Sequence, residues 1–105
     1  MSNNINKYQL SCDAENDLTE IARYTLSNWG RETFEEYRNG LKGIFIDIGN
    51  NNVISKSFSN KLPGLRVVKF KYHFIFYIVD NVPIPIIIGI IHEKRDLVKQ
   101  LDLRL

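Results

Sequence analysis

The segment from Leu65 to Asp96 constrains the fold more than any other part of this sequence. It is rich in aromatic and β-branched residues, which favour strands. We predict strands over Leu65–Phe70, His73–Asp80 and Ile84–His92. The last run is almost continuously apolar, so we expect it to be buried on both faces or nearly so. Short connections between consecutive strands favour an antiparallel meander.

Two amphipathic helices are predicted before this segment. Alternation over Lys7–Ser11 suggests a short strand, and Ser11 is a suitable N-cap for the helix that follows. Apolar positions then recur at helical spacing until Gly30, at Ala14, Leu18, Ile21, Ala22, Thr25 and Trp29. We interpret Trp29 as a core residue, and Cys12, just after the cap, as a small buried filler.

The second helix is predicted to begin near Arg31 and to end at Gly49. Its apolar seam contains Phe34, Tyr37, Leu41, Ile44, Phe45 and Ile48. Gly40 and Gly43 lie within it, either for close approach of a neighbouring element or as points of local weakness. With only Gly30 between them, the two helices should form an antiparallel hairpin.

The remaining segments complete a single α+β domain over residues 1–105, with an N-terminal strand, a two-helix hairpin and a three-stranded antiparallel sheet. Residues 1–6 are polar and expected to be frayed. Residues 50–64 are predicted to form a long loop, and residues 97–105 a tail with helical spacing.

Composition narrows the class of protein and its location. The net charge of +2 is lower than a general DNA coat or polybasic membrane binder usually carries. One cysteine, Cys12, allows no internal disulfide, which fits the reducing cytoplasm. The N-terminus has no apolar secretory core, and the longest apolar run is far shorter than a membrane span. We therefore expect a cytoplasmic protein without cofactor, metal, membrane contact or sequence-specific nucleic-acid binding.

Several motifs, in order, resemble the ParE-like branch of the ParE/RelE toxin superfamily. The resemblance covers residues 8 to 96 and rests on the order and spacing of the motifs together. They are YQLSCDAENDLTEIARYT, NWG, Tyr37-x-x-x-Leu41, Leu65-Arg66, His73-x-Ile75-Phe76-Tyr77, and Ile91-His92 followed by Asp96.

This resemblance implies a fold and a set of partners. The family packs a helical hairpin on a small antiparallel sheet, the order of elements predicted above. It implies a type II toxin neutralised by a ParD-like antitoxin, which joins a ribbon-helix-helix domain to a tail that folds on the toxin. ParE-like members poison DNA gyrase, whereas RelE-like members cut messenger RNA on the ribosome.

The chemistry of RNA cleavage helps to choose between these branches. Cleavage needs a general base, a general acid and clustered cations, for which His73, His92 and Arg95 are candidates. The chain lacks the dense basic and Tyr/His ending of the nuclease members. Ile78 and Gly89 also stand at about the positions where ParE-like sequences often carry arginine, which keeps open a degenerate member that only binds antitoxin.

We therefore predict a gyrase-inhibiting toxin without a catalytic site of its own, with the ribonuclease as the alternative. The residues expected to bind the target or partner are Arg66, Lys69, Lys71, His92, Lys94 and Arg95. On one extended segment Lys69, Lys71 and His73 would share a face, unless a turn intervenes there. For the histidines a structural, hydrogen-bonded role is favoured over acid–base work. The apolar run Ile84–Ile88 should be core or a protected edge, in part beneath the antitoxin.

Overall fold

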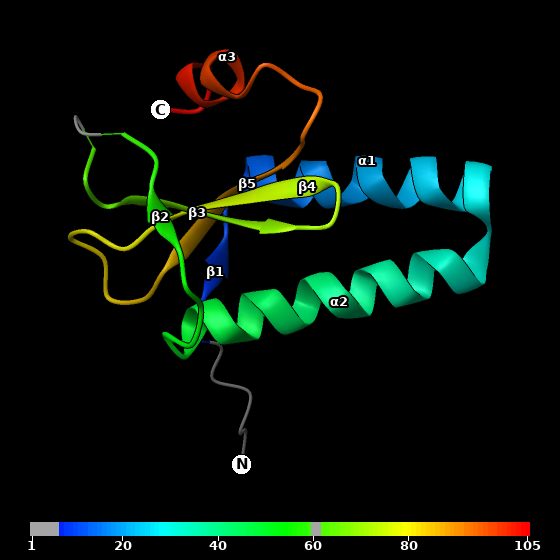
Figure 1. Cartoon of the computed structure of the whole chain (residues 1–105), viewed down its shortest axis with the longest axis horizontal. Helices are drawn as coiled ribbons and strands as arrows, with labels where there is room; N and C mark the ends of the chain where they lie inside the picture. The colour runs from blue at the N-terminus through cyan, green and yellow to red at the C-terminus, as the bar shows by residue number, and fades with distance from the viewer. Residues whose placement is uncertain (1–6, 60–61) are drawn as a thin grey trace.

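Ser11 begins the first helix as its sequence predicts. In the computed structural model, which describes residues 7–59 and 62–105, the Ser11 side chain accepts a hydrogen bond of 3.1 Å from the Ala14 backbone N–H. Helix α1 spans Cys12–Trp29 and ends at Gly30, whose φ of 89° favours glycine. Helix α2 follows directly over Arg31–Gly49, so the predicted hairpin is confirmed (Figure 1). The frayed end predicted for residues 1–6 lies outside the described residues.

The sheet is mixed and has five strands in the order β1-β5-β4-β3-β2. The predicted meander is confirmed by three antiparallel strands, β3 (Leu65–Phe70), β4 (His73–Ile78) and β5 (Ile86–His92). Strand β1 (Gln9–Leu10) adds to β5 in parallel, and β2 (Lys56–Ser57) forms within the predicted loop and pairs with β3. The predicted tail forms a short helix, α3 (Leu97–Asp102).

Strand β5 contributes apolar side chains to both faces of the sheet, as its sequence predicts. The register shifts between Phe76, which pairs with Gly89, and Tyr77, which pairs with Ile87. Ile88 is thereby the extra residue of a bulge. Ile87 packs with the helical hairpin, whereas Ile88 joins the cluster on the opposite face, and both are buried.

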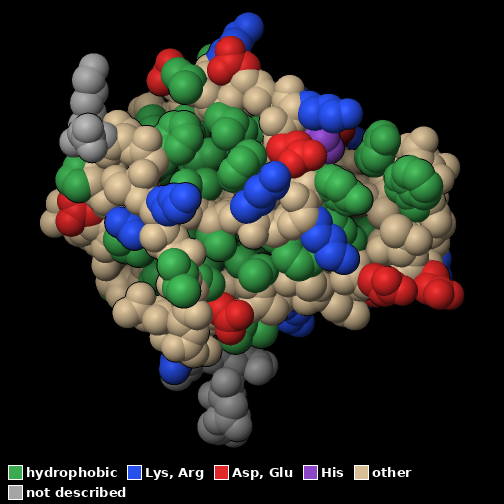
Figure 2. Space-filling model, viewed as in Figure 1, with side chains coloured by type: hydrophobic (Ala, Val, Ile, Leu, Met, Phe, Trp, Pro, Cys, Tyr) green, Lys and Arg blue, Asp and Glu red, His purple; other side chains and the backbone are tan. Residues whose placement is uncertain are grey.

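Two hydrophobic clusters form on the two faces of the sheet. Under the hairpin lie the buried residues Ala14, Leu41, Phe45, Ile48, Ile75, Tyr77, Ile87 and Ile90. The opposite face carries Leu65, Phe76, Ile88, Ile91 and Leu101, the last of which comes from α3. Figure 2 shows hydrophobic side chains gathered over the sheet, with lysine and arginine side chains among them.

Two predictions about burial are wrong. Trp29 is 66% exposed, because the end of the hairpin extends past the sheet and leaves the apolar stripe of α1 nothing to pack against (Figure 1). Cys12 is also exposed, because Ala14, and not Cys12, takes the buried position in the first turn of α1. The prediction that Phe76 and Tyr77 belong to the core is confirmed.

Close approach explains one of the two glycines in α2. A methyl group at Gly40 would overlap the ring of Phe70, the last residue of β3. Nothing lies within 4 Å of the corresponding position at Gly43. The first glycine therefore lets α2 pack on β3, whereas the second has no such role.

Candidate interaction surface

The turn between β3 and β4 separates the cations that the sequence places close together. Phe70 pairs directly with His73, so Lys71 and Tyr72 form a two-residue turn. Lys69 extends over the Phe74 ring, 5.2 Å from its centroid, and makes an ion pair of 2.7 Å with Glu93. The shared face expected for Lys69, Lys71 and His73 is therefore absent, and the turn is the reason.

Arg66 lies toward the other end of β3, where it is half-buried and holds the segment before β2. Its Nε donates to Ser55 Oγ at 3.0 Å, and its Nη2 donates to the Ser55 carbonyl oxygen at 2.9 Å. These bonds restrain the connection from α2 to the sheet. They leave the guanidinium less available to a partner than the sequence suggests.

His73 and His92 do come together, because they pair across β4 and β5. Their ring centroids are 5.2 Å apart in an edge-to-face arrangement. The Tyr37 hydroxyl from α2 lies 2.6 Å from His73 Nδ1 and also donates to the Phe70 carbonyl oxygen at 3.3 Å. The hydroxyl therefore links the helical hairpin to the end of the sheet.

Burial shifts the pKa values of both His73 and Tyr37. Removal from water, and then repulsion from His92, lower the pKa of His73 from 6.5 to about 4. Burial also raises the pKa of Tyr37 to about 12. Both groups are thus neutral at pH 7, and each pKa lies far from the value that suits proton transfer there. The geometry fits a structural hydrogen bond.

Lys94 and Arg95 follow His92 in an exposed turn at the same end of the sheet. The backbone N–H of Lys94 donates to His92 Nδ1 at 3.1 Å, and that of Arg95 donates to the His92 carbonyl oxygen at 2.9 Å. The backbone of this turn is therefore anchored, while both cationic side chains reach solvent. We call Lys69, Lys71, His92, Lys94 and Arg95 together the cationic end of the sheet.

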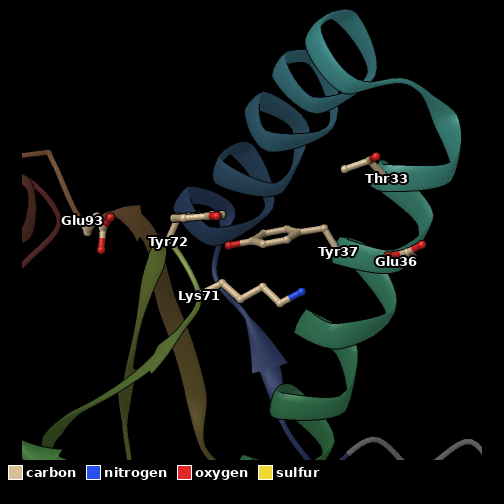
Figure 3. A pocket seen from close by; sticks show the side chains of 6 residues that line it. All are labelled: Thr33, Glu36, Tyr37, Lys71, Tyr72 and Glu93. Carbon is tan, nitrogen blue, oxygen red and sulfur yellow. The ribbon is translucent and has the colours of Figure 1, made fainter.

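A cleft of about 540 Å³ opens between α2 and the cationic end. One wall comes from α2, and the other comes from the β3–β4 turn and Glu93. Figure 3 shows the Tyr37 ring reaching from α2 toward the turn, and the Lys71 side chain reaching back toward α2. The lining residues are Thr33, Glu36, Tyr37, Lys71, Tyr72 and Glu93.

A second polar cluster, which sequence reasoning missed, lies on the far edge of β5. Arg104 and Asp17 form a bidentate ion pair, with distances of 2.6 Å from Nη1 to Oδ2 and 2.9 Å from Nη2 to Oδ1. Asp17 also accepts from the Ile90 N–H at 2.8 Å, and Arg104 donates to the Ile88 carbonyl oxygen at 3.0 Å. These two side chains thus satisfy backbone hydrogen-bonding groups of β5 that lie beyond the residues paired with β1.

Gly89 makes room for this ion pair. The Cβ of any other residue would lie 2.9 Å from Arg104 Nη1. The resemblance places an arginine of many ParE-like sequences at about this position, and here the guanidinium of Arg104 lies beside it. A sequence signal for the cluster did exist, because Asp17 follows Ala14 by three residues on the apolar stripe of α1.

The part of the chain that the structure describes contains no helix with the length and hydrophobicity needed to cross a membrane. Within residues 7–59 and 62–105, no three His, Cys, Asp or Glu side chains are grouped so as to hold a metal ion.

Comparison with known proteins assigns the family. Residues 8–97 match the family model described as the ParE toxin of the type II toxin-antitoxin system, parDE. The chain is 30% identical over 98 residues to Toxin ParE of Escherichia coli, covering 93% of this chain and 95% of that protein. A solved structure of the chromosomal ParDE TA system from P. aeruginosa matches the fold, with a TM-score of 0.68 at 16% identity over 81% of this chain and 92% of that one. The chain therefore belongs to the ParE toxin family of type II toxin–antitoxin systems.

Proposed function

We propose that this chain inhibits DNA gyrase by binding it through the cationic end of the sheet and the adjoining cleft. The observation that carries the proposal is the contrast between the two kinds of group at this end. Lys71, Lys94 and Arg95 are exposed and form no ion pair with any described residue, whereas His73 and Tyr37 are half-buried and hydrogen-bonded to each other. Such an arrangement suits recognition of a protein target better than acid–base chemistry.

We further propose that a ParD-like antitoxin with a ribbon-helix-helix domain neutralises the toxin by covering apolar surface on the α3 face. Several hydrophobic side chains there are only half-buried, and they pack against a cluster that includes Phe76 and Leu101. They are Phe58, Val67, Phe74, Ile78, Ile86 and Leu97. A contiguous apolar surface of this kind is typical of a binding site for a segment that folds on contact.

A ribosome-dependent ribonuclease is the second candidate, and one observation favours it. His73 and His92 are neighbours across two strands, and Arg95 follows in the next turn. Two imidazoles and a cation are groups that cleavage at a ribose 2′-hydroxyl requires. The lowered pKa of His73 argues against this candidate.

A paired assay on purified, antitoxin-free protein tests the proposal. One reaction holds gyrase, ATP and relaxed plasmid, and the other holds ribosomes with a messenger in the decoding site. Loss of supercoiling or accumulation of cleaved plasmid, with intact message, is expected. Cleaved message with normal supercoiling would instead establish the ribonuclease. Folded, antitoxin-binding protein that is inactive in both reactions would identify a degenerate member.

A further inference from the structure

Lys71 occupies a backbone conformation that lysine rarely adopts. Its φ is 50°, at the first position of the two-residue turn between β3 and β4. Glycine, asparagine or aspartate usually stands in such turns, because other residues bring Cβ too close to the backbone there. The other non-glycine residues with positive φ in the described parts of the chain are Asn51 and Asn81, both of a type that tolerates it. Lys71 is therefore the strained position.

The turn places the charged side chain of Lys71 at the mouth of the cleft. The Lys71 side chain reaches toward α2 (Figure 3), with its ammonium 5.5 Å from the centroid of the Phe70 ring. It forms no ion pair with any residue that the structure describes. A cation that lacks an ion-pair partner among the described residues and is held by an unfavourable turn indicates a side chain kept for an external contact.

The charges lining the cleft indicate what it accepts. The carboxylate of Glu93 is already paired with Lys69, at 2.7 Å. Glu36 on the opposite wall, like Lys71, has no ion-pair partner among the described residues. The free groups are thus one cation and one anion, beside the rings of two tyrosines. A phosphate backbone needs clustered cations, so this lining suits a protein segment of mixed charge.

We infer that this cleft binds a segment of the target protein that presents a carboxylate to Lys71, a basic or amide group to Glu36, and an apolar side chain to Tyr37 and Tyr72. The inference rests on the proposed function, because the segment is assigned to gyrase. The antitoxin is assigned to the α3 face of the sheet. Toxicity and neutralisation therefore use different surfaces.

Lys71→Gly tests this inference, because glycine is the residue that the turn favours. The variant keeps a fold at least as stable as the wild type by thermal unfolding, since strain is relieved. The concentration needed to inhibit gyrase supercoiling is expected to rise by about tenfold or more, the loss typical of a binding residue that contributes 1.4 kcal/mol. Lys71→Arg should retain most of the inhibition.

Asn81→Gly is the matched control, because it also places glycine at a positive φ but in a different turn. It should inhibit gyrase like the wild type, and both glycine variants should bind a ParD-like antitoxin with the same affinity as the wild type. Full inhibition by Lys71→Gly, or an equal loss of its antitoxin binding, would overturn the inference. Wild-type protein that leaves gyrase untouched would overturn the proposed function itself, and this inference with it.

Discussion

The two edges of the sheet differ in how completely other residues cover them. The edge of β5, an almost purely apolar strand, is covered first by β1 and then by the pair of Asp17 and Arg104. The edge of β3 is covered only over two residues by β2, and β3 leads into the cationic end of the sheet. The fold thus closes the edge most prone to aggregation and leaves accessible the edge that carries charge.

Arg104→Ala should break the closed edge and have the largest effect. Its removal leaves Asp17 unpaired with its side chain only 16% exposed, so we expect the free energy of unfolding to fall by about 3 kcal/mol. The opened edge of β5 should also promote self-association. Urea unfolding and light scattering measure the two effects.

Arg23→Ala is the control for that experiment. Arg23 and Glu20 also form an ion pair, but their side chains are 74% and 73% exposed. Solvent screening of this exposed pair limits the loss in the free energy of unfolding caused by Arg23→Ala to less than about 0.5 kcal/mol. Similar losses for the two variants would show that Arg104 has no special role in closing the edge.

Gly40→Ala should disturb the less covered edge, with an intermediate effect. The added methyl group meets the Phe70 ring at the end of β3, and overpacking of this kind lowers the free energy of unfolding by about 1–3 kcal/mol. Gly43→Ala adds the same group to the same helix in open space, and should raise that free energy by up to about 1 kcal/mol. Urea unfolding should therefore give changes in the free energy of unfolding of opposite sign for the two variants. A loss of stability in both would contradict the close contact between Gly40 and the Phe70 ring.

The smallest expected effect is on the pH dependence of stability, which reports on His73 at the end of the sheet next to the cleft. The pKa of His73 is about 4 in the folded chain and ordinarily 6.5, so the unfolded chain takes up the proton first as the pH falls. The contribution of neutral His73 is therefore complete above pH 6.5 and is lost progressively toward pH 4. Urea midpoints between pH 7 and pH 4 measure this slope.

His73→Gln should flatten that slope, whereas His92→Gln should retain most of it, because repulsion from His92 is only the second cause of the lowered pKa. An unchanged slope in His73→Gln would mean that other groups dominate the titration. In that case the link from Tyr37 to His73 would contribute little to the pH dependence.

Local signals in the sequence predicted the helices and the main strands well. The hydroxyl of Ser11, the glycine at position 30 and the apolar spacing of α2 each act within a few residues, so they determine structure wherever the rest of the chain lies. The Trp29 prediction failed for the complementary reason. Its spacing is helical and correct, but burial depends on how far the sheet extends, which no local pattern contains.

The candidate site was predictable only in part. The strand predictions placed His73 and His92 at strand ends, but the bulge at Ile88 shifts the register so that the two histidines pair directly, and no sequence pattern predicted that bulge. The left-handed turn at Lys71 could not be predicted, because lysine gives no turn signal. The partnership of Asp17 and Arg104 joins residues 87 positions apart, so the position of Asp17 on α1 was a sequence signal for the cluster but could not identify its partner.

The distance along the chain between Asp17 and Arg104 has a kinetic consequence. The two residues are 87 positions apart, whereas the two helices meet through a one-residue connection at Gly30. Closing so large a loop is entropically slow, so the ion pair should form after the rate-limiting step of folding. Interactions that form late affect the rate of unfolding more than the rate of folding. We therefore expect the pair of Asp17 and Arg104 to affect how long the folded toxin persists more than how quickly it first forms.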